Sequence, residues 1–368
     1  MKKIIINLLV FFPLCFSSCN LIDFSEGDSY PHDSISFMKY DIVTGVKSVI
    51  NPNIASVPGF GYPPKFYYVE DSNRAFYFGD SSGYFEGENS KSINLNYTSR
   101  ESLFSNTQKW ILFAEGDWSG KNVFLLNTST LEIFKVDIPH FEDLEEYLSF
   151  SADDEEIVFV GSDPTLYSTT LYIMETATRT TSKITDFSFN YDIFPSINYP
   201  VFSSDKQKIF FVLTKTITDN QAYSKPGLYL INRDGSSLTL IDEGDAYTVD
   251  TYIKEEDKWI SESWSWISDV NIAASGNKVF YCYDENIYSA NQDGSGIVNT
   301  GMSKDYSDNI KVSSSGNKII FFEKKSVSNI SIYNNQDNFI IDRGYNAMFS
   351  KDENSIEYTQ AKMMAGKK

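Results

Sequence analysis

An eleven-residue pattern of apolar and polar positions recurs along the chain. Its fullest copies, Phe150–Val160 and Phe202–Val212, each begin with an apolar residue, continue with six mainly polar residues and end with four apolar ones. Such a copy predicts the end of one β-strand, a tight turn and the start of a second strand. We call it the turn cassette, and its seven copies start at Val69, Phe104, Phe150, Phe202, Ile272, Val312 and Phe349.

A second pair of apolar runs follows most of the turn cassettes. Leu228–Asn232 and Ile287–Asn291 are examples, and the dipeptides Asp234-Gly235 and Asp293-Gly294 that follow them are typical of hairpin turns. Four strands in a repeat of about 40 residues are typical of one blade of a β-propeller. The pattern therefore predicts an all-β fold built from such blades.

The two ends of the chain supply complementary halves of one blade. Nine residues follow the last turn cassette, too few for a second strand pair, whereas Ser36–Val49 looks like a second pair with no first pair before it. Joining the two halves closes the ring and removes exposed sheet edges. We therefore predict a seven-bladed β-propeller over residues 34–360, with its last blade closed by N-terminal strands.

Two alternatives concern this architecture. The turn cassettes at Phe202 and Ile272 start 70 residues apart, an interval long enough for an eighth blade. Tyr252–Ile260 is the candidate turn cassette of that blade. The other alternative is a β fold that is not a propeller.

The repeat resembles that of the TolB-like and PD40-type (WD40-like) β-propellers, whose blades carry FSPDGKKIAF followed by IYVMDADG. The resemblance covers about residues 34–360 and implies the propeller fold, but it hardly specifies function because propellers host unrelated activities. TolB itself has an additional N-terminal domain for which this chain has no room, so a Tol-Pal role is not implied.

The first residues are typical of a secretory signal. Lys2 and Lys3 precede the apolar run Ile4–Phe16, which is too short to span a bilayer. Small residues then lead to Cys19, a sequence that resembles the lipobox of bacterial lipoproteins and implies lipidation of Cys19. We expect a signal peptide over 1–18, a lipidated tether over 19–33 and a C-terminal tail over 361–368. The alternative is an ordinary secretory signal with an incidental cysteine.

The expected location is therefore that of an exported lipoprotein, anchored to the outer membrane on its periplasmic or surface face. Cys282 is the cysteine left in the folded part, so no intramolecular disulfide is expected, and its apolar strand indicates a small buried side chain. The formal charge of −19 and a pI near 4.5 argue against nucleic acid as a partner. We expect a monomer that contacts the membrane through its lipid and binds an envelope protein or glycan.

The long connections between strands should lie on one face of the propeller. Neighbouring strands of a blade, lettered a to d from the centre outwards, are antiparallel, so the a–b and c–d turns share one face, the turn face, and the b–c and d–a connections share the other, the connection face. The variation in length falls in the connections Glu115–Lys121, Gly161–Thr169, Asp186–Pro200, Thr214–Gly227 and Glu243–Asp269. Binding residues concentrate in loops of this kind.

Aromatic residues gather in these connections. We select Trp118, Tyr223, Trp264 and Trp266 as candidate binding residues because aromatic side chains with a polar edge commonly anchor interfaces and sugars. The alternative is that the tryptophan-rich insertion folds over the disc as a lid and buries its own rings.

The sequence contains few of the residue patterns that are typical of catalytic or metal sites. The two histidines, His32 and His140, have no partner at metal-ligand spacing, and no G-x-S-x-G motif is present. We therefore expect no metal, no cofactor and no catalytic residue, and predict a non-enzymatic binding or scaffold lipoprotein. The alternative is a carbohydrate-active enzyme, a glycosidase or lyase, with a pair of carboxylates in the propeller funnel.

Overall fold

The fold is taken from a computed structural model. It describes residues 35–51, 65–72, 74–79, 82–86, 91–94, 98–115, 122–138, 147–163, 168–188, 197–217, 225–244, 247–253, 258–265, 267–272, 277–303, 310–313, 315–323, 329–334, 337–343, 345–350 and 352–361. The chain divides into two units. One comprises Met1–Pro31 and Met363–Lys368, outside the described residues, and the other, His32–Lys362, contains all of the described strands.

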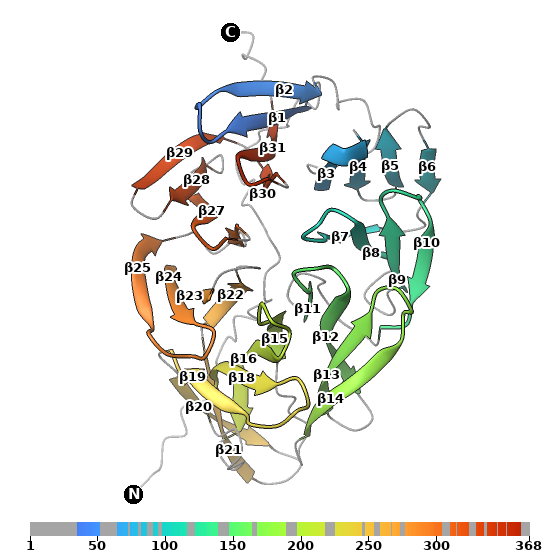
Figure 1. The fold of residues 1–368 in the computed structure, drawn as a ribbon. Helices are drawn as coiled ribbons and strands as arrows, with labels where there is room; N and C mark the ends of the chain where they lie inside the picture. Colours follow the sequence, from blue (N-terminus) through green and yellow to red (C-terminus); the bar gives the residue numbers. More distant parts are fainter. Residues whose placement is uncertain are drawn as a thin grey trace, which may run out of the picture. The chain divides into compact units, whose positions relative to one another are not determined.

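The described strands of the second unit form seven antiparallel sheets of four strands and one sheet of three strands. Figure 1 shows the four-stranded sheets following one another around a central region. Six of them consist of strands in chain order, and we number them as blades 1 to 6. The seventh combines strands from both ends of the sequence, and we call it the closing sheet.

The blades have the following strands. Blade 1 consists of β3 (Lys65–Val69), β4 (Arg74–Gly79), β5 (Ser82–Glu86) and β6 (Lys91–Asn94); blade 2 of β7 (Thr98–Phe104), β8 (Trp110–Glu115), β9 (Asn122–Asn127) and β10 (Ile133–Val136); and blade 3 of β11 (Leu148–Phe150), β12 (Glu156–Asp163), β13 (Ser168–Glu175) and β14 (Thr181–Ser188). Blade 4 consists of β15 (Ile197–Phe202), β16 (Lys208–Leu213), β18 (Gly227–Asn232) and β19 (Thr239–Asp242); blade 5 of β22 (Ile267–Ile272), β23 (Lys278–Tyr283), β24 (Asn286–Asn291) and β25 (Val298–Ser303); and blade 6 of β26 (Lys311–Val312), β27 (Lys318–Glu323), β28 (Asn329–Asn334) and β29 (Asp337–Arg343).

The closing sheet confirms that the last turn cassette pairs with N-terminal strands. Its order is β2 (Lys47–Asn51), β1 (Ile35–Asp41), β31 (Ser355–Ala361) and β30 (Tyr345–Phe349). β1 pairs with β31 along its whole length, from Ile35 opposite Ala361 to Asp41 opposite Ser355. This arrangement is consistent with a seven-bladed propeller closed by strands from both termini.

The turn cassettes form the predicted strand–turn–strand units. In six of the seven, the first and eighth residues lie opposite each other across the turn, as Phe150 and Ile157 do. The cassette of blade 1 differs from the other six, because Val69 lies opposite Arg74 instead of Phe76. A short 3₁₀ turn, η1 (Glu70–Ser72), replaces the usual turn there.

A serine and an aspartate hold the cassette turn. The Ser151 hydroxyl accepts a hydrogen bond from the Glu156 amide at 3.0 Å and donates to Asp153 Oδ1 at 2.7 Å. The same bonds recur at Ser203 with Asp205 and at Ser350 with Asp352. These local bonds explain why the cassette reads apolar-Ser-x-Asp.

The fifth cassette residue adopts a left-handed backbone conformation. Its φ is about +60° at Gln108, Asp154, Lys206 and Glu353, and +73° at Gly316. Glycine reaches this region without the steric cost of a Cβ, which explains its use at Gly316.

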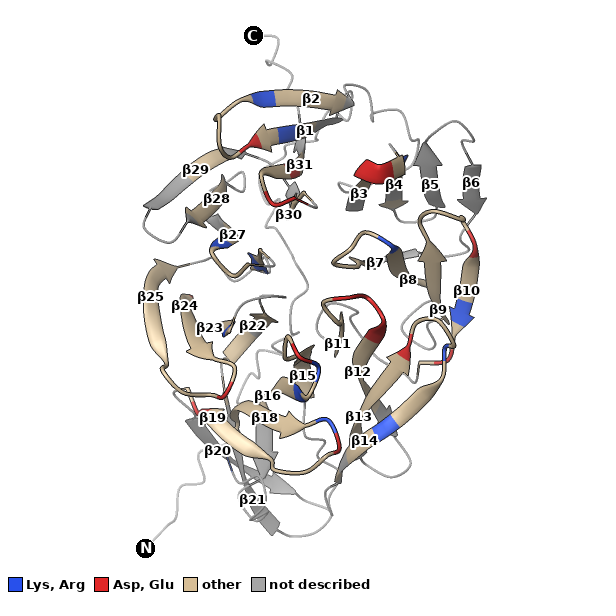
Figure 2. Cartoon of the chain, viewed as in Figure 1, with Lys and Arg blue, Asp and Glu red and all other residues tan. Residues whose placement is uncertain are grey.

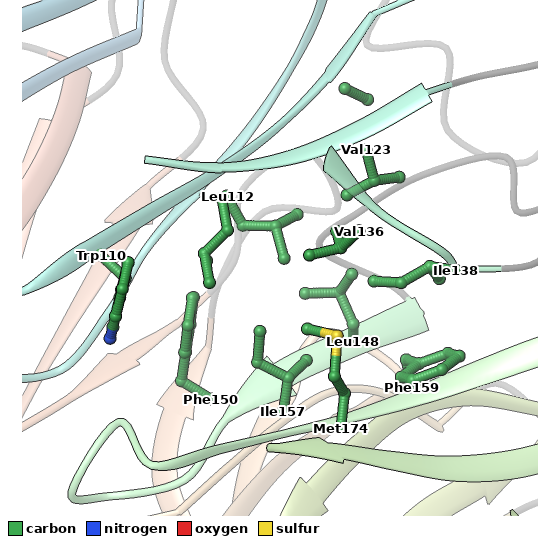
Figure 3. Close-up of a cluster of buried hydrophobic side chains, with 12 residues drawn as sticks. Trp110, Leu112, Val123, Val136, Ile138, Leu148, Phe150, Ile157, Phe159 and Met174 are labelled. Carbon is green, nitrogen blue, oxygen red and sulfur yellow. The ribbon is translucent and has the colours of Figure 1, made fainter. Parts of the chain in front are cut away.

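The core consists of apolar clusters shared by neighbouring sheets. Figure 3 shows the one between blades 2 and 3, where Leu112 and Trp110 lie close to Phe150 and Ile157. Along β12, Ile157 and Phe159 pack towards blade 2, whereas Val158 and Val160 pack towards blade 4. Since both faces of a blade are buried, its central strands are apolar throughout instead of alternating.

The proposed eighth blade is not formed by the described residues. The segment around its candidate cassette does make a hairpin, of β20 (Tyr247–Ile253) and β21 (Lys258–Trp264), in which Tyr252 lies opposite Trp259. That hairpin joins the short strand β17 (Lys215–Ile217) in the three-stranded sheet. Because β17 precedes β18 of blade 4, the sheet combines two insertions instead of forming a separate blade. We call it the added sheet.

Candidate binding face

The added sheet unites two insertions that are separate in sequence. β17 belongs to the b–c connection of blade 4, and the β20–β21 hairpin belongs to the d–a connection from blade 4 to blade 5. β21 is the central strand, with Thr216 of β17 and Thr248 of β20 both opposite Ser263. The pairing joins the two connections through main-chain hydrogen bonds.

Both insertions lie on the connection face. Neighbouring strands of blade 4 are antiparallel, so its b–c and d–a connections leave on the same side. In Figure 1, β20 and β21 are drawn fainter, and therefore farther from the viewer, than the turn that joins β15 to β16. The topology predicted for these two insertions is thus confirmed.

The two ends of the hairpin insertion meet at blade 4. The Ser265 hydroxyl donates a hydrogen bond to the Glu243 carbonyl at 3.3 Å, and the Ser265 amide donates to the Thr214 carbonyl at 3.0 Å. Ser265 is buried. This side chain therefore connects the start and end of the insertion, and its backbone joins them to the end of β16.

Asp242 fixes the direction in which the insertion leaves blade 4. Its Oδ2 accepts a hydrogen bond from the Tyr281 hydroxyl of blade 5 at 2.6 Å, and its Oδ1 accepts one from the Gly244 amide at 3.0 Å. Burial raises the pKa of Tyr281, and the bond to Asp242 raises it further. Gly227 allows the close approach of β18 to this point, because a Cβ there would collide with the Asp242 carbonyl oxygen.

The other end of the b–c insertion is fixed in a similar way. The Tyr229 hydroxyl donates to the Lys225 carbonyl at 2.6 Å, and burial together with the nearby Glu243 raises the pKa of Tyr229 to about 12. An exposed ion pair joins Lys225 to Glu243. Hydrogen bonds and an ion pair therefore fix the positions at which both insertions leave blade 4.

The structure places one of the four predicted binding residues in this sheet. Trp264 is the last residue of β21, where its backbone lies opposite Lys215 on one side and Tyr247 on the other. Trp118, Tyr223 and Trp266 lie outside the described residues. Their grouping with Trp264 stays a prediction.

Several long connections were delimited too widely from sequence, because β14 continues to Ser188, β15 begins at Ile197 and β22 begins at Ile267. Gly161–Asp163 and Ser168–Thr169 are paired residues of β12 and β13, so the connection between these strands is residues 164–167. The apolar-to-polar change at Gly161 ended the predicted strand too early.

The turn face carries bonds between neighbouring blades. Arg233 of blade 4 donates to Glu156 of blade 3 at 2.7 Å, and Lys206 contacts Asp153 at 2.6 Å. Figure 2 shows the acidic turn between β11 and β12 beside the basic residues of the turn between β15 and β16. Partial burial opposes ionisation of Asp153, but the bonds from Lys206 and Ser151 outweigh it and lower its pKa to about 2.

Glu357 is a buried carboxyl group that the sequence did not reveal. It lies on β31 with no exposed surface, and neither side-chain oxygen has a hydrogen-bond partner among the described groups. Burial raises its pKa to about 8, and the negative charge of Glu70 adds to this effect, partly offset by Lys39. Since Lys39 contacts Glu70 at 2.7 Å, the group links the closing sheet to blade 1.

The described part of the chain contains no group of three or more His, Cys, Asp and Glu side chains arranged to hold a metal ion. It also contains no helix long and apolar enough to cross a membrane. Cys19, His32 and His140 lie outside the residues so described.

No protein-family model matches the chain, and no curated protein matches it. Several solved structures are similar to the chain. Oligogalacturonate lyase from Vibrio parahaemolyticus is 12% identical with a TM-score of 0.52, over 89% of this chain and 97% of the lyase chain. The tricorn protease is 9% identical with a TM-score of 0.50, over 85% of this chain and 34% of that one.

TolB from Acinetobacter baumannii is also similar, with 13% identity and a TM-score of 0.46. The alignment covers 89% of this chain and 64% of the TolB chain. At such identities the likeness concerns the fold alone. Together with the sheet topology, the likeness to the lyase and to the tricorn protease defines the class of the chain as an all-β propeller, a fold shared by proteins of different activities.

Proposed function

We propose that the chain is a non-enzymatic binding or scaffold lipoprotein of the cell envelope that uses the connection face of its propeller. The added sheet is the observation that carries this proposal. The blades are already four-stranded without it, and two insertions of blade 4 combine to build it. Elaborations of this kind on a rigid scaffold are common places for binding.

The proposed partner is an envelope protein or a glycan. Trp118, Tyr223, Trp264 and Trp266 would provide its aromatic contacts, since such side chains supply large contact areas with a polar edge. Lipidation at Cys19 would hold the propeller at the outer membrane, on its periplasmic or surface face. The protein would act as a monomer and would require no metal or cofactor.

The described residues favour binding over the glycosidase or lyase alternative. Glu357, the carboxyl group with the strongly raised pKa, has no exposed surface to offer a substrate. Glu156 and Asp153 on the turn face are engaged by Arg233 and Lys206. Neither arrangement supplies an accessible acid and base on opposite sides of a sugar bond.

Deletion of the hairpin tests the proposal. Because Ser265 contacts Glu243, residues 245–263 can be replaced by a short Gly-Ser linker without separating the remaining ends. The mature protein and the deletion variant would be used as bait for solubilised envelope, after thermal melting confirms that the ring is retained.

We expect specific capture to be lost in the deletion variant. Asp234→Ala and Asp293→Ala, each of which removes the cap of a c–d turn on the turn face, are the controls and should retain capture. Capture that survives the deletion but is lost in these controls would place the site on the turn face and overturn the proposal.

A further inference from the structure

β20 is an edge strand of unusual length and regularity. It is the outer strand of the added sheet, and within the described part of the chain it pairs with β21 alone. All seven of its residues, Tyr247–Ile253, are paired without a shift of register. Its other edge can therefore offer a regular series of main-chain donors and acceptors to a further strand.

The other long edge strands of the described sheets are interrupted. β7, β14 and β29 have seven or eight residues, and each has a register shift relative to its neighbour. The remaining terminal strands have six residues or fewer. Register shifts and short strands are devices that prevent unwanted pairing at an edge, and β20 has neither.

The amino-acid composition of β20 also favours pairing with a further strand. Its sequence, YTVDTYI, consists of β-branched and aromatic residues with a single charge, Asp250. By contrast, lysines occur in other outer strands, at Lys91 in β6, Lys135 in β10 and Lys183 in β14. Lysine is a common means of protecting an edge strand, and β20 contains none.

The negative charge of the hairpin decides between two possible occupants of this edge, a second copy of the chain and a segment of another protein. Residues 245–264 contain six acidic side chains and two lysines, and the whole chain has a formal charge of −19. If a second copy paired symmetrically along all seven residues, Asp250 would lie opposite Asp250, and like charges at directly opposite positions are destabilising. A cationic segment of another protein avoids this repulsion.

We infer that β20 binds an extended, positively charged peptide segment of a partner protein by adding it to the added sheet as a fourth strand. This inference rests on the proposed function and specifies its partner as a protein. Main-chain hydrogen bonds to β20 would supply affinity, and the acidic hairpin would select basic side chains.

The test uses fluorescence anisotropy with the full mature chain. The probe is a labelled heptapeptide of alternating threonine and lysine, capped at both ends. One control has glutamate in place of lysine, and another has alternate amides N-methylated so that one edge loses its donors. We expect both controls to bind at least about tenfold more weakly, a difference equal to about 1.4 kcal/mol. Equal binding of the N-methylated probe would overturn the inference.

Two adjacent proline variants test the strand directly. In an antiparallel pair, successive amides point to opposite edges, so Thr248→Pro and Val249→Pro remove one donor that faces β21 and one that faces the outer edge. The variant whose melting temperature is unchanged should lose lysine-probe binding and the probe-induced protection of 247–253 from hydrogen exchange. Retained binding and protection in that variant would overturn the inference.

Two outcomes separate this inference from the proposed function. If deletion of residues 245–263 abolishes envelope capture while the proline variant that melts normally captures as the wild type does, the face binds but edge pairing is wrong. A concentration-dependent dimer in sedimentation that this proline variant abolishes would identify a second copy as the occupant and would also overturn the inference.

Discussion

Replacing Glu357 with glutamine should stabilise the protein at alkaline pH. The folded-state pKa of about 8 exceeds the ordinary value of 4.5, so the folded protein holds a proton that the unfolded chain releases between these two values. Stability from this group is therefore complete below pH 4.5 and is lost as the pH rises towards 8. Each pKa unit corresponds to about 1.4 kcal/mol, so the whole loss is about 5 kcal/mol.

The assay is urea unfolding of wild type and Glu357→Gln from pH 4.5 to pH 8.5. Glutamine resembles the protonated acid in shape and stays neutral, so the two proteins should be similar at pH 4.5 and diverge by several kcal/mol at pH 8.5. Exposed Glu132, changed to glutamine, is the control and should follow the wild type. Parallel profiles for wild type and Glu357→Gln would show that the Glu357 carboxyl group is not destabilising when it is ionised in the folded protein.

The remaining predictions concern the anchor, the closure and the contacts between blades. Cys19→Ala should leave the precursor unprocessed or release the protein from the membrane fraction, and unchanged processing and partitioning would contradict lipidation. Removal of residues 349–368 deletes β31 from the closing sheet and should lower the melting temperature far more than removal of residues 362–368; equal values would argue against closure by both termini. Arg233→Ala leaves the nearly buried Glu156 without its bidentate partner and should cost about 1–3 kcal/mol in urea unfolding, whereas an unchanged midpoint would show that the pair contributes nothing.

The acid limb of the stability profile has a separate origin. Hydrogen bonds from Ser350 and the Asn354 amide lower the pKa of Asp352 to about 2, so its contribution to stability is present above its ordinary value of 3.8 and is lost as the pH falls towards 2. The Glu357 measurement begins above this range. The two effects can therefore be resolved in one pH series.

The parts of the fold that were predictable depend on local chemistry. Ser151 and Asp153 hold their turn through bonds within five residues, so the sequence reveals the turn directly. The central strands are apolar throughout because both faces of each blade are buried, and this pattern is visible in the repeated sequence. Blade 1 departed from the pattern because its 3₁₀ turn at Glu70 shortens the loop and changes the register.

Features that depend on distant segments were not predictable in the same way. The added sheet requires Thr216 to lie opposite Ser263, a pairing between insertions that no local pattern specifies. Likewise, Glu357 follows Ile356 in an ordinary strand sequence, and its burial arises when the closing sheet meets blade 1. The grouping of the four candidate aromatic residues was not predictable from local sequence either. Trp264 is placed by the pairing of its strand, whereas Trp118, Tyr223 and Trp266 lie outside the described residues.

Site-specific photo-crosslinking in cells tests the binding face most directly. A benzoylphenylalanine would be introduced at Trp264, on the connection face, or at Ser236, an exposed c–d turn residue of the same blade. We expect a discrete crosslinked partner from position 264 and none from position 236. A partner crosslinked from position 236 alone would show that the turn face, and not the connection face, binds the partner.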